Sequence, residues 1–470
     1  MSSSVISEAA EAGSFRDPGG QVYLLDGRVF RTVMPCAVED FDFVRSTGLI
    51  SELVEQGQLI PESVVDPSML GEAGAHASYV LEHPLLPFIS YPYEWSFAAL
   101  KAAAIHQLDI HLCALEYGVT LSDATAYNIQ FRGVKPVFID SLSFRRYQEG
   151  EFWLGHRQFC EQFLNPLLLR SITGIPHNSW YRGGMEGICA QELNQVLPFH
   201  RKLSFNVLTH VVLQARFQSQ AGSQHDAERV VTKRKLALTA FRQMLLGLRK
   251  WINKLEPAGT GKTVWQEYSQ ENSYSTDEVL LKRKFIALFT QSVSPEILWD
   301  IGCNSGEYSK TALDAGADSV VGFDFDHGAL DLAFSRASVE GLNFLPLYLD
   351  ATNPAPLQGW AQKERQGLMQ RANADGILAL ALVHHLAIGK NIPLPGVIGW
   401  IVSMAPQGII EFVQKSDPMV QELLRLREDI FNDYSEDTFT HALEKKAVIE
   451  RTETVSASGR KLFWYRRNQC

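Results

Sequence analysis

The second half of the chain alternates short apolar runs with longer segments of helical periodicity. Five apolar runs of strand length stand at residues 297–299, 319–323, 344–349, 376–382 and 408–413. Continuous apolar runs are typical of strands that helices cover on both faces of a sheet. Strands that alternate with helices favour a doubly wound parallel sheet, which binds ligands at its carboxyl edge. We therefore predict an α/β domain with such a sheet over residues 265–470.

The first half of the chain has a more mixed pattern. Two alternating runs flank Asp26-Gly27, a dipeptide that is typical of tight hairpins. Apolar residues recur with helical spacing from Ser96 to Tyr117 and, with basic residues between them, from 227 to 254. We predict a disordered tail over residues 1–18, an α+β domain over 19–215 and a helical linker over 216–264.

A glycine turn follows the apolar run at 297–299. The run ends in Asp300, and Gly302 and Gly306 come just before a new helical pattern. Glycine lets the backbone approach a ligand because it has no Cβ, and a helix start offers free N–H groups. The spacing is Asp-x-Gly-x-x-x-Gly, whereas dinucleotide-binding folds have Gly-x-Gly-x-x-Gly.

Acidic residues and a histidine pair end the next three runs. Asp324 lies 22 residues after Gly302, about where an acidic residue binds ribose hydroxyls in mononucleotide-binding units. The third run ends in Asp350, and the fourth leads into His384-His385. Because the carboxyl ends of parallel strands share one edge of the sheet, we expect these side chains to surround one site.

This ordered set of motifs resembles the class I S-adenosylmethionine (SAM)-dependent methyltransferases. The resemblance implies a Rossmann-like fold and SAM as the cofactor. It implies that Asp300 orders the turn, that Asp324 binds the ribose, and that Asp350 faces the adenine amine. An aromatic segment before the first strand often covers SAM in that family, which makes Tyr274 a candidate. The full set of predicted cofactor-binding residues is Asp300, Gly302, Cys303, Asn304, Gly306, Ser309, Asp324, Phe325, Asp350, Ala351 and Tyr274.

His384 and His385 are the candidate catalytic residues. They are the one adjacent histidine pair in the chain and follow the fourth strand, next to where the methyl acceptor is expected. A histidine near its ordinary pKa could deprotonate a hydroxyl. The alternative is a structural role, since class I enzymes often have this dipeptide without using it as a base. Glu411, at the end of the fifth strand, is a lesser candidate.

The segment from 120 to 144 is similar to the catalytic segment of protein-kinase-like phosphotransferases. Asp123 and Asn128 are five residues apart, and Asp140 lies 12 further on, across a predicted hairpin. In kinases such residues act as base and magnesium ligands. The kinase His-Arg pair and the Gly-rich loop are missing, and Asp-Ser-Leu replaces Asp-Phe-Gly. We therefore expect a degenerate kinase-like remnant; the alternative is that these residues only cap turns and end a strand.

The composition of the chain limits the classes of binding partner and indicates the cellular compartment. The net charge of −10 and the isoelectric point near 5.8 argue against a general nucleic-acid-binding surface. The six cysteines are scattered without a Cys-x-x-Cys pair, which favours a reducing compartment and predicts no metal site. No uncharged apolar run is long enough to span a membrane, and the first residues lack a signal pattern. We expect a cytoplasmic protein.

Most of the chain also resembles a bacterial family of two-part proteins. Members are labelled SAM-dependent methyltransferases, and some are labelled host-specific nodulation proteins. The segments that carry this resemblance are 85–93, 138–140, 412–420, 427–431 and 458–465. It implies a methyltransferase but gives no secure acceptor. The acidic charge favours a small molecule, a glycan or a natural-product hydroxyl or amine as acceptor over nucleic acid, with a protein acceptor left open. The alternatives are a non-catalytic SAM-binding protein that recruits a partner, and a bifunctional protein with a magnesium–ATP site.

Overall fold

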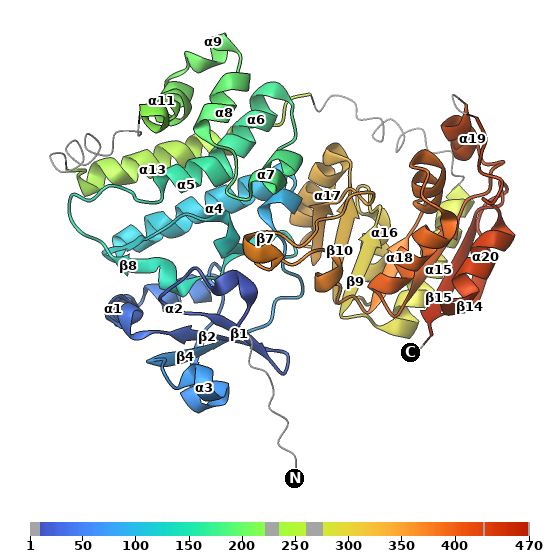
Figure 1. Cartoon of the computed structure of the whole chain (residues 1–470), viewed down its shortest axis with the longest axis horizontal. Coiled ribbons are helices and arrows are strands. Elements are labelled where there is room, and N and C mark those ends of the chain that lie inside the picture. Colours follow the sequence, from blue (N-terminus) through green and yellow to red (C-terminus); the bar gives the residue numbers. More distant parts are fainter. Residues whose placement is uncertain (1–9, 221–234, 260–275, 426–427, 469–470) are drawn as a thin grey trace.

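The computed structural model describes residues 10–220, 235–259, 276–425 and 428–468. Figure 1 shows two halves side by side, an N-terminal half in blue to green and a C-terminal half in yellow to red. The chain passes from one half to the other between α13 (Leu238–Asn253) and α15 (Thr276–Val293).

The C-terminal half is a seven-stranded sheet with helices packed on it. Five strands run parallel, and two more extend one edge of the sheet through antiparallel pairing. In sheet order the strands are β11 (Phe344–Tyr348), β10 (Ser319–Asp324), β9 (Ile297–Ile301), β12 (Gly376–Ala379), β13 (Gln407–Phe412), β15 (Lys461–Arg467) and β14 (Ala447–Thr454). The helices are α15, α16 (Glu307–Asp314), α17 (His327–Glu340), the π-helix η11 (His385–Gly389), α18 (Leu394–Met404), α19 (Pro418–Leu424) and α20 (Glu436–Glu444). The predicted Rossmann-like methyltransferase fold is confirmed.

Two details of this sheet differ from the prediction. β12 ends at Ala379, before the expected Leu382, because the N–H of Ala381 bonds to Glu411 instead of continuing the ladder. The antiparallel strands β14 and β15 were not predicted, since charged residues at the exposed positions of β14 interrupt its apolar pattern.

The N-terminal half combines a small sheet with a helical lobe. Its sheet is antiparallel in the order β1 (Val22–Leu25), β2 (Arg28–Val33), β4 (Tyr79–His83) and β3 (Ser63–Val65). The predicted hairpin at Asp26-Gly27 is confirmed, with φ of 50° and 73° at the two turn residues. Two short antiparallel pairs follow, β5 (Val119–Leu121) with β8 (Phe144–Arg146) and β6 (Ile129–Arg132) with β7 (Lys135–Phe138).

The long helix α4 (Phe97–Glu116) is the centre of the N-terminal half. Ser96 caps it by accepting the N–H of Ala99. Of the helices in the described ranges, none is long and apolar enough to cross a membrane. The other helices of this half are α1 (Val38–Thr47), α2 (Leu49–Glu55), α3 (Gly71–Gly74), α5 (His156–Phe159), the π-helix η7 (Cys160–Leu164), α6 (Asn165–Thr173), α7 (Asn178–Gly184), α8 (Ala190–Val196), α9 (Phe199–Lys202), α10 (Phe205–Val207), the π-helix η8 (Leu208–Val212) and α11 (Leu213–Gln220).

The segments expected to be a tail and a linker make contacts with the rest of the chain. In the tail, the N–H of Glu11 bonds to Val22 O at 2.7 Å, and Arg16 forms a two-pronged ion pair with Glu364. Residues 1–9 lie outside the described residues. In the linker, α13 lies along α4 in Figure 1. Its buried side chains are Phe241, Leu245, Leu248 and Ile252.

The two halves share one continuous apolar core. Phe88 packs edge-on against Trp299 and Phe323 of the large sheet, with ring centroids 5.6 and 5.9 Å apart. Glu94 and Arg371 form a buried ion pair across the same boundary. A buried charge is costly unless it is paired, so this boundary is a fixed contact that brings the N-terminal half against the carboxyl edge of the large sheet.

Candidate active site

The strand order reverses at one point in the large sheet. β10 and β11 lie on one side of β9, and β12 and β13 lie on the other. Open α/β sheets bind their ligands at the carboxyl ends of the strands that flank such a switch point. The glycine turn follows β9 and the histidine pair follows β12, so the structure brings both predicted motifs to this place. A Cβ at Gly302 would lie 3.7 Å from Leu380 O, which shows how closely the two loops approach.

Asp300 lies beneath the glycine turn rather than in contact with solvent. It is 2% exposed, and its carboxylate accepts a hydrogen bond of 2.6 Å from Ser309 Oγ. Burial raises the pKa of Asp300 to about 7. The bond joins the end of β9 to the first turn of α16, so Asp300 and Ser309 fix the position of the turn between them.

Asp324 holds the turn from the neighbouring strand. Its two carboxylate oxygens accept the N–H groups of Asn304 at 2.8 Å and of Asp326 at 2.9 Å. Burial raises the pKa of Asp324 to about 6. The backbone of Phe325 also stabilises this carboxylate. An ionised carboxylate has about four lone-pair sites, so Asp324 can still accept from a ligand hydroxyl.

Gly306 and Cys303 have packing roles in the turn. Gly306 has φ of 81°, and a Cβ there would lie 2.5 Å from the ring of Phe344. Cys303 is 5% exposed and packs against Gly322, and burial raises the pKa of its thiol well above the ordinary value. A protonated, buried thiol is a poor nucleophile.

A small hollow lies at the carboxyl end of β11, and both halves of the chain line it. Asp350 and Tyr348 come from the C-terminal half, and Tyr93, Asn178 and Arg182 come from the N-terminal half. Arg182 crosses the boundary and donates to Asn353 O at 2.8 Å. Sequence analysis found Asp350 but missed the N-terminal residues, since nothing in their local pattern points to the large sheet.

Phe325 and Ala351 follow the acidic residues at the strand ends. Phe325 is 55% exposed, which is unusual for a large apolar side chain next to a buried strand. Ala351 is half-buried, and Asp350 accepts both the N–H and the hydroxyl of Thr352. Tyr274 lies outside the described residues.

The two histidines differ in their surroundings. His384 is 1% exposed and its ring lies 4.2 Å from that of His385, which is half-buried. Burial lowers the pKa of His385 to about 4 and that of His384 well below its ordinary value. Both rings are therefore neutral at pH 7, which is the form that accepts a proton.

Glu411 is the acceptor of a buried ion pair next to this loop. Lys282 Nζ lies 2.7 Å from one oxygen of Glu411 and 2.9 Å from the other. The second oxygen also accepts the N–H of Ala381, just before the histidines. Both oxygens of Glu411 are therefore used in contacts that hold the loop before His384 in place. Sequence analysis missed Lys282, although a lysine on the apolar side of α15 was a usable signal.

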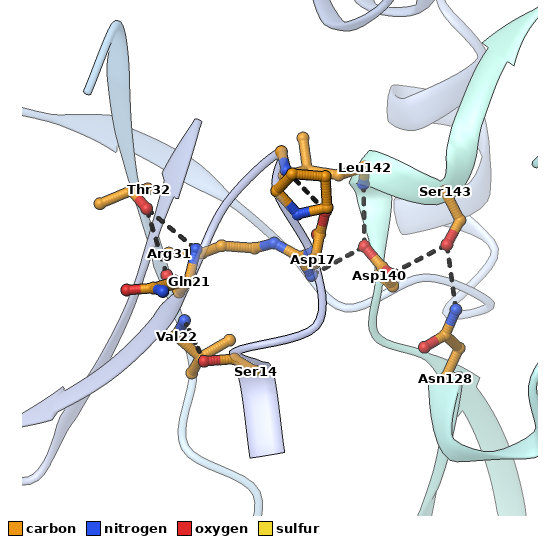
Figure 2. A network of polar contacts seen from close by, with 12 residues as sticks. Ser14, Asp17, Gln21, Val22, Arg31, Thr32, Asn128, Asp140, Leu142 and Ser143 are labelled. Carbon is orange, nitrogen blue, oxygen red and sulfur yellow. Dashed lines mark hydrogen bonds and ion pairs between the residues drawn. The ribbon is translucent and has the colours of Figure 1, made fainter. Parts of the chain in front are cut away.

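The kinase-like motif lies at the centre of a polar network (Figure 2). One oxygen of Asp140 is 2.7 Å from Arg31 Nη1, and the other accepts from Ser143 Oγ at 2.8 Å. Arg31 also contacts Asp17 at 2.6 Å. A guanidinium therefore neutralises Asp140, the residue that the sequence resemblance pairs with a magnesium ligand of kinases. The network joins the tail, β2 and the end of β7.

The two other residues of that motif lie nearby. Asn128 Nδ2 donates to Ser143 Oγ at 3.0 Å and lies 3.3 Å from a carboxylate oxygen of Asp123. Burial and the charge of Asp140 raise the pKa of Asp123 to about 7. The three predicted residues are thus together in space. The kinase-like interpretation stays a prediction.

The sequence has a close curated relative. It is 45% identical over 459 residues to nodulation protein NoeA of Rhizobium meliloti (strain 1021), an alignment that covers 97% of this chain and 96% of the relative. The chain belongs to the NoeA family of nodulation proteins. The resemblance to a bacterial family that includes nodulation proteins is therefore confirmed. No family model matches this NoeA-family chain.

Solved structures of methyltransferases are similar at a lower level. N-methyltransferase NodS from Bradyrhizobium japonicum WM9, in complex with S-adenosylhomocysteine, is 12% identical with a TM-score of 0.32, and the match covers 44% of this chain and 100% of NodS. Magnesium protoporphyrin IX methyltransferase from Synechocystis PCC 6803, with the same ligand bound, is 17% identical with a TM-score of 0.32, covering 47% and 99%. The Rossmann-like fold follows from the strand order of the large sheet itself.

Proposed function

We propose that this NoeA-family chain is a SAM-dependent methyltransferase. The observation that carries the proposal is the placement of Asp324 and the glycine turn at the switch point of the sheet. Asp324 is a buried carboxylate at the end of β10 with acceptor capacity left for a ligand hydroxyl, and the turn that it holds precedes the start of α16. These features fit the ribose and the amino-acid part of SAM.

The residues at the switch point would bind different parts of SAM. Asp324 accepts the ribose hydroxyls, and the exposed ring of Phe325 offers a face for the adenine. Asp350 accepts from the adenine amine in the hollow that Arg182 and Asn178 close from the N-terminal half. Asp300 and Ser309 keep the turn in position. SAM itself supplies an activated methyl group, so the protein has mainly to orient two reactants and exclude water.

The acceptor is proposed to be a small molecule or glycan with a hydroxyl or amine. The neutral ring of His385 is half-buried beside the switch point and is the candidate base for its proton. The N-terminal half packs against this edge of the sheet, so it shapes the access route and is expected to position the acceptor. The acidic net charge of −10 does not favour a nucleic acid as acceptor.

The first test is titration calorimetry with S-adenosylhomocysteine. The wild type is expected to bind, and Asp324→Asn to bind about 10- to 100-fold more weakly, because hydrogen bonds to a charged group contribute about 1.5–3 kcal/mol. Asp318→Asn is the matched control, since Asp318 is exposed and lies just before β10, at the opposite end of the strand from Asp324. Binding would justify an acceptor screen with labelled SAM. No binding by folded wild-type protein would contradict the proposal.

A further inference from the structure

Two histidines and a cysteine meet in the helical lobe of the N-terminal half. His156 on α5, Cys160 on η7 and His210 on η8 have ligand atoms that all lie within 4.8 Å of one another. His156 Nε2 is 3.1 Å from His210 Nδ1 and 3.7 Å from Cys160 Sγ. Across the ranges that the structure describes, no other group of three His, Cys, Asp or Glu residues is this tight.

These separations are those of ligands on one tetrahedral ion. Zinc bonds of roughly 2.0–2.1 Å to nitrogen and 2.3 Å to sulfur place two nitrogens about 3.3 Å apart, and nitrogen and sulfur about 3.6 Å apart. The observed 3.1 and 3.7 Å are close to both values. Thiolate and imidazole together suit zinc among the common biological cations.

The local structure explains how the three side chains meet. His156 and Cys160 are four residues apart and therefore lie on one face of their helix. Cys160 begins a π-helix, and His210 is inside a second one. Single π-turns are rare and occur frequently at functional sites, because they shift a side chain out of α-helical register. Here the two π-turns bring the third ligand beside the first two.

Gln214 gives a second and independent indication. Its Nε2 lies 3.0 Å from His156 Nδ1 and donates to Cys160 Sγ at 3.6 Å, while its Oε1 is buried without a hydrogen-bond partner. A histidine that binds a metal through Nε2 carries its proton on Nδ1, and that proton needs an acceptor. Turning the Gln214 amide over places Oε1 on Nδ1–H, in exchange for the contact of Nε2 with Cys160 Sγ. The tautomer of His156 that an ion at Nε2 requires is therefore also the one that gives the orphaned oxygen a donor.

We propose that His156, Cys160 and His210 form a zinc site. The two imidazoles bind as neutral ligands, and Cys160 binds as a thiolate after releasing its proton to solvent. Gln214 orients His156. The ion would join α5 and η7 to η8, close to Trp251 of α13, whose ring is 6.1 Å from that of His210. The site lies on elements that do not line the methyl-transfer crevice, so it is independent of the proposed function.

The sequence alone predicted no metal site, because its cysteines are scattered. His156 and Cys160 have the spacing of a helical ligand pair, but the third ligand, His210, comes 50 residues after Cys160. That long gap has no recognised motif, so the site became visible only in the fold.

The test uses the full-length protein, reduced and stripped with a chelator, and then titrated with Co²⁺ and Zn²⁺. We expect one Co²⁺ per chain, with a thiolate-to-cobalt charge-transfer band and the visible spectrum of a tetrahedral site, and displacement by Zn²⁺. Zn²⁺ is expected to raise the melting temperature, since it binds the folded state. Cys160→Ser should lose the charge-transfer band, and His210→Asn should bind far more weakly.

Matched controls keep the result specific. Cys189→Ser and His200→Asn change the same residue types outside the cluster and should bind Co²⁺ as the wild type does. Gln214→Leu is expected to lower the affinity about 10- to 100-fold, as loss of a partner that orients a ligand does. The proposal is overturned if the folded wild type takes up neither ion, or if folded Cys160→Ser gives the wild-type spectrum and affinity.

Discussion

Lys282 of α15 and Glu411 of β13 form an ion pair that solvent does not reach. The side chains are 1% and 0% exposed, and Nζ lies 2.7 Å from the nearer oxygen. Glu411 also accepts the N–H of Ala381, at the start of the loop that carries the histidine pair. The carboxylate of Glu411 therefore joins three elements, α15, β13 and the loop after β12. This loop lies on the side of the proposed site where the methyl acceptor is expected.

Removing one partner of this pair is predicted to be costly. Lys282→Met leaves the buried charge of Glu411 without its main partner, and such changes lower stability by about 3–5 kcal/mol. Lys282→Met with Glu411→Gln removes both charges while the amide still accepts from Ala381, so the double variant should be more stable than the single one. Denaturant unfolding of both measures this. Lys284→Met, an exposed change on the same helix, is the control. Equal stability of Lys282→Met and the control would contradict the prediction.

The large sheet was predictable because its central strands are buried on both faces. The sequences of strands such as β9 and β10 are nearly unbroken apolar runs, which predicts buried strands. The predicted cofactor-binding residues stand at the ends of these runs, so the same pattern predicted the strands and the site. β14 was not found because Glu450 and Arg451 lie at exposed positions and interrupt the run. An edge strand is partly exposed to water, so polar residues are common in it and its hydrophobic pattern is weak.

Residues that act across long sequence distances could not be predicted. Arg182 lines the hollow beside Asp350 only because α7 packs against the end of β11. The partner of Asp140 was also missed, since Arg31 comes from β2, far from the motif in sequence. A local pattern identifies which residue types can do chemistry, whereas the neighbours that neutralise or cover them depend on the fold.

The affinity for S-adenosylhomocysteine is predicted to depend on the charge of Asp324. Its pKa is raised to about 6 by burial, and only the ionised form accepts from both ribose hydroxyls. The affinity should therefore be constant from pH 8 to about 7 and fall below pH 6, by at most about tenfold per pH unit. Calorimetry at several pH values measures this slope. Asp324→Asn cannot ionise, so its weaker binding should not change over the same range. An identical slope in both proteins would exclude Asp324 as the titrating group.

Asp300 is predicted to make the protein less stable as the pH rises. Its pKa is about 7 in the folded chain and about 3.9 when unfolded, so between these values the folded state holds the extra proton. Its contribution is present below pH 4 and is lost as the pH rises through 7, at about 1 kcal/mol per pH unit. Asp300→Asn keeps an acceptor for Ser309 and cannot ionise.

The melting temperatures of Asp300→Asn and the wild type, compared from pH 4.5 to 7.5, test this. The variant should gain on the wild type as the pH rises, and the difference isolates Asp300 from the buried histidines, whose contribution has the opposite sign. A constant difference across this range would show that Asp300 does not carry the proton.

His385 rather than His384 is predicted to matter for turnover. His384 is 1% exposed and is expected to support the loop, whereas half-buried His385 can reach an acceptor. With the acceptor found by labelled SAM, His385→Ala should lower kcat about 10²- to 10⁴-fold, the usual loss of a general base, with unchanged affinity for S-adenosylhomocysteine. His441→Ala, an exposed change, is the control. Because the pKa of His385 is about 4, the wild-type kcat at saturating SAM should be flat above about pH 5. If both His385→Ala and His384→Ala turn over as fast as the wild type, neither histidine is the base. The proton of the acceptor would then be lost to solvent.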